Sequence, residues 1–214
     1  MRRVELFGPP GVGKTTIYKS TMALRNSATR PFYNSSEAKL MAEIDSYDGQ
    51  DVSTWKAFSE FVASAYAGCS GRKALLHARH LATRRELARV AALTSSPVET
   101  LVLLDESLCM RGISLALSEP AAETVVEDYF RGMPPADIVA VIVADEQTVS
   151  LRNIRRGAHG TGADRSAQTR AILKTCRMAA AILRARRIEV VELDGRLPPR
   201  TNAVELVKMM EQRH

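Results

Sequence analysis

Cysteine is scarce and scattered in this sequence of 214 residues. The three cysteines, Cys69, Cys109 and Cys176, lie far apart, and none forms a C-x-x-C pair or stands in metal-like spacing with a histidine. We therefore expect neither a disulfide framework nor a zinc ribbon, because both need clustered cysteines. Free thiols fit a reducing compartment, and this predicts a cytoplasmic protein.

Long apolar runs are missing as well. No run approaches the roughly 20 residues that a helix needs to cross a bilayer. The stretch after Arg2 and Arg3 is too short for a signal peptide and leads straight into glycines. Aromatic residues make up only 5% of the chain, with one tryptophan, which leaves little material for stacking nucleic-acid bases. We expect no membrane association.

The remaining composition is that of a globular protein, with 45% hydrophobic and 25% charged residues. We expect a single domain over 1–214, because the length suits one domain with an elaboration. Short apolar segments with the pattern of strands recur along the chain, at 3–7, 30–35, 100–104, 137–144 and 188–193. The segment 30–35 is the weakest of them and fits a loop equally well.

Helical patterns separate these strands. We expect helices at 13–25, 37–45, 53–67, 72–93, 108–117, 120–130 and 166–186, one after Asp145 and one from Thr201 or Asn202. Buried strands that alternate with helices predict an α/β fold, in which helices cover both faces of a parallel sheet. The helical region near 50–95 is expected to be an insertion between the second and third strands.

Positive charge is concentrated in two segments. The net charge of the whole chain is +6, yet 151–187 holds ten basic residues and one acid, and 72–89 holds six basic residues and one acid. The rest of the chain is therefore acidic. This distribution favours a polyanionic partner, which is a nucleoside triphosphate, a phosphorylated substrate or a nucleic acid. Solvated arginine-rich helix faces are the plainer interpretation.

A glycine loop directly after the first strand carries the most specific motif. The sequence GPPGVGKT, Gly8 to Thr15, matches G-x-x-x-x-G-K-[ST] in full. In such a loop the main-chain N–H groups and the start of the following helix face phosphate oxygens. Lys14 would bridge the β- and γ-phosphates, and Thr15 would bind Mg²⁺. We expect this segment to bind ATP through Gly8, Pro9, Pro10, Gly11, Val12, Gly13, Lys14, Thr15 and Thr16.

Two acids end the third predicted strand, in LVLLDES at 101–107. This edge of a parallel sheet is where ligands bind. We expect Asp105 to hold Mg²⁺, and Glu106 to orient or deprotonate the nucleophile. An N-terminal cap for the next helix is the alternative. Arg111, six residues after Asp105, would contact a substrate phosphate or the acceptor, or else lies on the surface.

An arginine-rich segment with a glycine turn follows the fourth strand, at 151–170. A hinged loop that carries guanidinium groups can close over the triphosphate and neutralise charge in phosphoryl transfer. An exposed basic loop is the alternative. After the last strand, the Leu-Asp-Gly turn at 193–195 lies at the same sheet edge. We expect Gly195 to flank the nucleotide base, although an ordinary turn fits nearly as well.

In this order and spacing the motifs resemble those of the small P-loop kinases, above all the thymidylate kinase and deoxynucleoside kinase group. The lid of that group has R-x-x-x-R-G followed by D-R, and the matching residues here are Arg152, Arg156, Gly157, Asp164 and Arg165. The resemblance implies a five-stranded parallel sheet in the order 2-3-1-4-5, with a lid at about 155–166. It also implies that Arg152 stacks near adenine and that Arg156 and Arg165 engage phosphates.

The sequence departs from that group at the end of the third strand. The group has Asp-Arg or Glu-Arg there, whereas this chain has Asp105-Glu106. The second strand also lacks a clear acidic motif for binding the acceptor. These differences leave the acceptor open.

The leading hypothesis is an ATP- and Mg²⁺-dependent kinase that acts on a nucleoside, a nucleotide or a similar small acceptor, with a homodimer left open. A second hypothesis makes the acceptor a base or an end within DNA or RNA. A third is an ATPase switch or assembly module, although only about 20 residues follow the last strand, too few for the helical domain of AAA assemblies. The predicted catalytic residues are Lys14, Asp105, Glu106, Arg111, Arg156 and Arg165.

Overall fold

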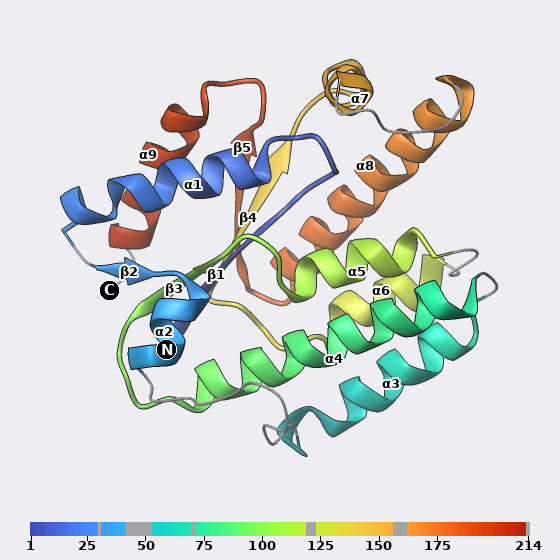
Figure 1. Ribbon diagram of the computed structural model, residues 1–214, viewed down its shortest axis with the longest axis horizontal. Coiled ribbons are helices and arrows are strands. Elements are labelled where there is room, and N and C mark those ends of the chain that lie inside the picture. The colour runs from blue at the N-terminus through green and yellow to red at the C-terminus, as the bar shows by residue number, and fades with distance from the viewer. Residues whose placement is uncertain (30, 42–52, 70–71, 119–122, 156–161, 213–214) are drawn as a thin grey trace.

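A parallel sheet forms the centre of the molecule (Figure 1). The computed structural model describes residues 1–29, 31–41, 53–69, 72–118, 123–155 and 162–212. The strands are β1 (Arg2–Phe7), β2 (Phe32–Tyr33), β3 (Leu101–Leu104), β4 (Ile138–Val143) and β5 (Glu189–Asp194). They pair in the order β2-β3-β1-β4-β5, and all pairs are parallel. The strand order that the kinase resemblance implies is confirmed.

Alternate residues of each strand enter different cores. In β4, Ile138 and Ala140 pack on one face of the sheet, while Val139 and Val141 pack on the other. Both sets are fully or almost fully buried. This explains why β3 and β4 appear in the sequence as continuous apolar runs, because both faces of these strands are almost entirely buried.

Helices cover both faces (Figure 1). One face carries α1 (Lys14–Leu24) and α9 (Pro199–Gln212), which pack against each other. The other face carries a larger helical layer, made of α3 (Lys56–Ala67), α4 (Lys73–Ser95), α5 (Leu108–Ala116), α6 (Glu123–Gly132) and α8 (Gly162–Ala185). Two further helices, α2 (Ser35–Met41) and α7 (Glu146–Arg155), follow β2 and β4.

The predicted helices are observed with adjusted ends. The predicted second strand has only two residues in the structure. The last helix begins at Pro199, two residues before its predicted start, because proline is tolerated in the first turn of a helix. Positions 42–45 and 120–122 of two predicted helices lie outside the described residues.

Within the described part of the chain, no helix has both the length and the apolar character of a membrane span.

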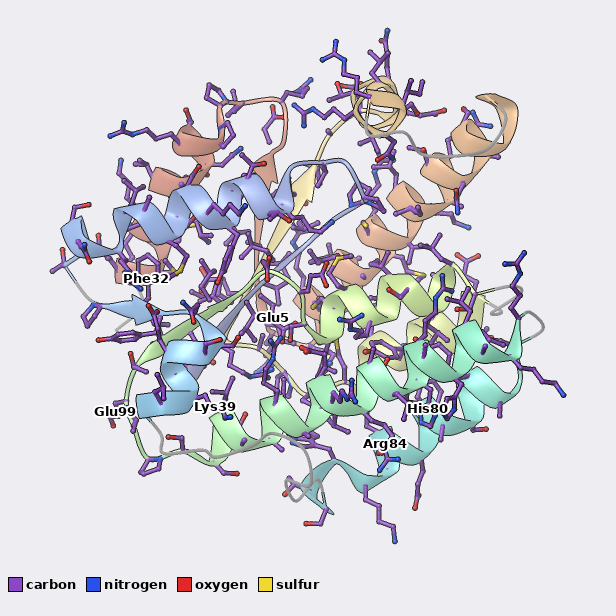
Figure 2. The ribbon with its side chains drawn as sticks, viewed as in Figure 1. Glu5, Phe32, Lys39, His80, Arg84 and Glu99 are labelled. Atoms are coloured by element: carbon purple, nitrogen blue, oxygen red, sulfur yellow. The ribbon has the colours of Figure 1, made fainter. Side chains whose placement is uncertain are left out.

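A buried ion pair links the central strand to α5. Arg3 Nη1 lies 2.9 Å from Glu5 Oε1, and both side chains are almost inaccessible to water. Glu5 lies between the sheet and the helical layer in Figure 2, where its other carboxylate oxygen accepts a hydrogen bond of 3.2 Å from the main-chain N–H of Cys109. Cys109 is in the first turn of α5, so this hydrogen bond fixes the start of α5, and the bend at 105–107 before it, against β1.

Candidate nucleotide and acceptor site

The glycine loop adopts a conformation that requires glycine. Gly11 and Gly13 have φ values of +84° and +108°, a region that residues with a Cβ atom rarely occupy. At Gly8, a Cβ atom would come within 2.6 Å of the main-chain oxygen of Ile142. The glycines of the motif therefore permit both the turn itself and its close approach to β4.

The loop presents positive groups at the carboxyl end of β1. Lys14 Nζ donates hydrogen bonds to the main-chain oxygens of Gly8 at 2.9 Å and of Pro9 at 3.1 Å. The N-terminus of α1 has no side-chain cap and no acidic residue in its first turn. Thr15 and Thr16 in that turn are exposed. This arrangement suits an anion, because the free N–H groups and the helix dipole favour negative charge.

Arg152 of α7 connects the loop to the turn after β5. Its Nη1 donates to the main-chain oxygens of Val12 at 3.0 Å and of Gly195 at 2.8 Å. Gly195 lies so close to the loop that a Cβ atom there would come within 2.9 Å of Val12. Arg152 and Gly195 were both predicted to lie beside the nucleotide. In the structure both residues contact the glycine loop.

A cavity of about 340 Å³ opens beside these contacts. Its wall combines loop glycines with residues of α1, α7 and the β5–α9 turn, namely Gly11, Val12, Gly13, Thr16, Ile17, Arg152, Arg155, Gly195, Leu197 and Pro199. The volume suits a small ligand, and the wall is mostly apolar with two arginines. It adjoins the glycine loop, which contributes Gly11, Val12 and Gly13 to its wall.

Asn153 of α7 was not predicted from the sequence. Its Oδ1 lies against Gly11, so close that a Cβ atom on Gly11 would be only 2.4 Å away. Helix α7 therefore covers the glycine loop with two consecutive side chains, Arg152 and Asn153. Within the arginine-rich segment nothing distinguishes this asparagine, since its role depends on contact with a loop about 140 residues away.

The predicted acids lie at the same edge of the sheet as the loop. Strand β3 is hydrogen-bonded to β1, with Glu5 opposite Leu104, so Asp105 follows β3 next to the loop that follows β1. Asp105 is half-buried and forms no hydrogen bond or ion pair with any other described residue. The pKa of the Tyr18 hydroxyl on α1 is raised by burial and by the nearby charge of Asp105, which places this carboxylate close to α1.

Glu106 and Arg111 face each other across the start of α5. Arg111 Nη2 lies 3.7 Å from Glu106 Oε2, and the Glu106 side chain is 63% exposed. The Glu106 main-chain oxygen also accepts a hydrogen bond of 2.6 Å from Arg89 of α4, an arginine that no motif singled out. The structure therefore brings Asp105, Glu106 and Arg111 together and adds Arg89 to them.

The predicted lid lies largely beyond the described residues. Arg156 lies outside the described ranges, and for Arg165 the structure describes only the backbone, in the first turn of α8. Asp145, after which a helix was expected, caps α7, because it accepts a hydrogen bond of 2.7 Å from the N–H of Thr148. The catalytic roles of Arg156 and Arg165 stay predictions.

Comparisons with known proteins support the fold. No protein-family model matches the sequence, and no curated protein does. Among solved structures, deoxyadenosine kinase from M. mycoides with bound dATP matches with a TM-score of 0.56 and 12% identity, over 97% of this chain and 98% of that chain. The same enzyme with bound dCTP gives 0.54 and 12%, over 98% and 99% of the two chains.

A third structure of that enzyme, with products dCMP and a flexible dCDP, gives a TM-score of 0.52 and 12% identity over 99% of this chain and 100% of that chain. These matches extend over nearly the entire length of both chains, so they include the sheet and the helical layers on both sides. At this level of identity the likeness establishes the fold. The chain has the fold of a P-loop kinase, as the order of its motifs predicted.

Proposed function

We propose that this protein is an ATP- and Mg²⁺-dependent phosphotransferase that acts on a hydroxyl or phosphate group of a small molecule. One observation carries the proposal: the glycine loop with Lys14 and the carboxylate of Asp105 lie side by side at the carboxyl edge of the sheet. The nucleotides bound by deoxyadenosine kinase, dATP among them, support a nucleotide at this edge.

In this proposal the cavity beside Arg152 and Gly195 takes the nucleotide base, and the loop takes the phosphates. Lys14 would exchange the carbonyl oxygens of Gly8 and Pro9 for phosphate oxygens, which carry more negative charge and make stronger hydrogen bonds. Arg152 would keep its contacts with Val12 and Gly195 and hold the wall of the base cavity in place.

The residues present fit a magnesium ion held together with the nucleotide. The described residues contain no group of three or more His, Cys, Asp or Glu side chains that could hold a metal ion on their own. Mg²⁺ in phosphotransferases relies on one or two protein oxygens plus phosphates and water, and Asp105 with Thr15 would supply those oxygens. When bound, the ion would neutralise charge on the β- and γ-phosphates.

The transfer itself needs an oriented nucleophile. For a hydroxyl acceptor, the oxygen attacks the γ-phosphorus, the bond to the ADP oxygen breaks, and the hydroxyl proton passes to Glu106. A phosphate acceptor attacks through an oxygen that is already ionised, so Glu106 would then only orient it. Arg156 and Arg165 are proposed to neutralise the transferring group from the lid.

Lys14→Ala tests the proposal, with Lys19→Ala as its matched control. Lys19 is an exposed lysine on the same helix, five residues beyond Lys14. We expect Lys14→Ala to lower the transfer of labelled phosphate from ATP by at least about 10²-fold, the usual cost of removing one group that stabilises transferred charge. The melting temperature should stay close to that of the control. Retained transfer in Lys14→Ala would refute the assignment.

The nucleic-acid alternative is less well supported. This alternative depends partly on a basic stripe along α8, formed by Arg170, Lys174, Arg177 and Arg184. Three of the four pair with acids: Arg170 with Glu146 at 3.1 Å, Lys174 with Glu123 at 2.9 Å and Arg184 with Glu192 at 2.6 Å. Paired charges of this kind contribute little to phosphate binding, because most of their field is already balanced. Oligonucleotide binding that weakens steeply with salt would revive this alternative.

A further inference from the structure

Two arginines from different helices meet at Glu106 on the acceptor side of the site. Arg89 of α4 donates from Nη2 to the Glu106 main-chain oxygen at 2.6 Å, and Arg111 of α5 lies 3.7 Å from the Glu106 carboxylate. Their side chains are only 17% and 24% exposed. We call Arg89 and Arg111 the acceptor arginine pair, since both guanidinium groups are largely withdrawn from water beside the predicted catalytic acids.

Tyr18 connects the acceptor arginine pair to the phosphate loop. It lies four residues after Lys14 on α1. The pKa of its hydroxyl is raised by burial and by the negative charges of Asp105 and Glu37. The positive charge of Arg89 acts in the opposite direction and lowers this pKa. Arg89 and Asp105 therefore both lie within electrostatic reach of Tyr18, on the helix that carries the loop. A ligand held by the pair would stand next to the phosphoryl group that is to be transferred.

Three hydrogen-bond donors are left over at this bend. Seven buried side-chain polar atoms have no hydrogen-bond partner among the described residues, and three of the seven are Arg89 Nε, Arg111 Nε and Ser107 Oγ. A buried donor without an acceptor is unfavourable, and native proteins leave few of them. All three atoms can donate, and all three belong to residues at or against the bend 105–107, where donor capacity therefore remains unused.

The charge around the acceptor arginine pair is only partly balanced. Glu86 of α4 forms an ion pair with Arg89, and its side chain is 12% exposed. Burial raises the pKa of Glu86 more than Arg89 and Arg111 lower it, so this carboxyl group holds its proton more tightly than usual. The other carboxylate, Glu106, lies 3.7 Å from Arg111 and is 63% exposed, so water weakens this ion pair and an anionic ligand can compete for the arginine.

We infer that the acceptor arginine pair binds an oxyanion carried by the acceptor, so that the molecule phosphorylated is acidic and not a neutral nucleoside. Phosphate monoesters and carboxylates share the required chemistry, because both offer paired oxygens to the planar fork of an arginine. The inference rests on the proposed kinase function and specifies its substrate class.

Matched acceptors test the inference directly. The full-length protein is assayed with labelled ATP against deoxyadenosine and dAMP, deoxycytidine and dCMP, thymidine and dTMP, and glycerol and D-glycerate. In at least one pair, we expect the kcat/KM of the anionic acceptor to exceed that of its neutral partner by at least about tenfold. A preference for a nucleotide would indicate a phosphate monoester as the acceptor, and a preference for glycerate would indicate a carboxylate. A preference for the neutral members would overturn the inference and leave the kinase assignment intact. No transfer to any acceptor would refute the kinase function, and the inference with it.

Variants of the acceptor arginine pair provide the second readout. We expect Arg89→Gln and Arg111→Gln each to raise the KM for the acidic acceptor about tenfold or more, while the KM for ATP changes less than about twofold. Arg84→Gln, which removes an exposed arginine from α4, is the matched control and should change neither value (Arg84 is labelled in Figure 2). Arg111→Lys keeps the charge and serves if a glutamine variant unfolds. An unchanged acceptor KM in the folded variants, or an equal rise for ATP, would contradict the inference.

Discussion

In the proposed nucleotide site, the groups available to the ligand belong mainly to the main chain, namely the glycine loop and the first turn of α1. In the proposed acceptor site they are side chains that come from α1, α4 and the start of α5. A main-chain site needs a short contiguous motif, because its geometry is local. A side-chain site can be assembled from distant residues, as Arg89 and Arg111 are. This difference explains why the sequence identifies the phosphate loop and leaves the acceptor open.

The largest effect should come from breaking the main-chain side. Gly11→Ala places a Cβ atom on a residue with φ of +84° and within 2.4 Å of Asn153 Oδ1. The left-handed conformation alone costs about 1–2 kcal/mol with a side chain, and the contact with Asn153 adds to it. We expect ATP affinity to fall at least about tenfold in a calorimetric titration.

Gly68→Ala is the control for this change. Gly68 has φ of −77°, and a Cβ atom there would lie 3.6 Å from its nearest neighbour, an ordinary contact. ATP affinity should be unaffected. If both alanine variants bind ATP equally well, the conformation of the glycine loop is not what holds the phosphates.

A smaller effect should follow from Arg152→Gln. This change removes two charge-assisted hydrogen bonds, to Val12 and Gly195, that fix the wall of the base cavity. Hydrogen bonds to charged groups contribute about 1.5–3 kcal/mol each, and part of this is recovered by relaxation, so we expect the KM for ATP to rise about tenfold. The KM for the acceptor should not change. Arg200→Gln, on exposed α9 surface, is the control, and an equal rise there would contradict the assignment.

Two glutamates, Glu86 of α4 and Glu37 of α2, should respond to pH in opposite directions. The pKa of Glu86 is raised above 4.5 by burial, so the folded state binds its proton more tightly, and stability falls as the pH rises from 4.5 through the raised value. The pKa of Glu37 is lowered by its bond to Arg25, so its contribution is present above pH 4.5 and is lost as the pH falls below it.

Urea unfolding at several pH values measures both contributions. Glu86→Gln should remove the decline in the free energy of unfolding above pH 4.5. Glu37→Gln should remove part of the decline below it. If Glu86→Gln leaves the upper range unchanged, this carboxyl group is ionised as readily in the folded protein as in the unfolded chain, and the charge argument for the acceptor arginine pair loses its support.

The smallest effect is expected on α8. Lys174 and Glu123 form an exposed ion pair, with side chains 71% and 57% accessible. Such pairs contribute about 0–1 kcal/mol, so Lys174→Gln should change the free energy of unfolding by less than about 1 kcal/mol. A larger loss in thermal unfolding would show that the basic stripe is structural and not merely a solvated face.

Much of the fold could be predicted from the sequence, because β3 and β4 are buried on both faces and appear as short, bounded apolar runs. The strand β2 is the exception. It has only two residues and pairs with β3 alone, so little burial marks it in the sequence. Helix α9 begins at Pro199 and not at Thr201 or Asn202, because a proline fits the first helical turn and this extension has no other local signal.

The candidate site also has one part that could be predicted from the sequence and one part that could not. The glycine loop, Asp105 and Gly195 were predicted because each occupies the end of a recognisable strand. Arg89 and Asn153 could not be predicted, since one is a single arginine among six basic residues in 72–89, and the other acquires its position only when α7 folds over the loop. Their importance depends on tertiary contacts for which a single sequence contains no local signal.

The central claim, that the glycine loop and Asp105 together hold one Mg²⁺–ATP, is tested most directly by titrating ATP with and without Mg²⁺ into the wild type and Asp105→Asn. The substitution keeps the shape of a side chain that forms no other hydrogen bond or ion pair among the described residues. We expect Mg²⁺ to tighten ATP binding to the wild type by about tenfold or more, and this gain to be lost in Asp105→Asn while metal-free binding persists. An equal gain from Mg²⁺ in both proteins, or no ATP binding by the wild type, would contradict the account.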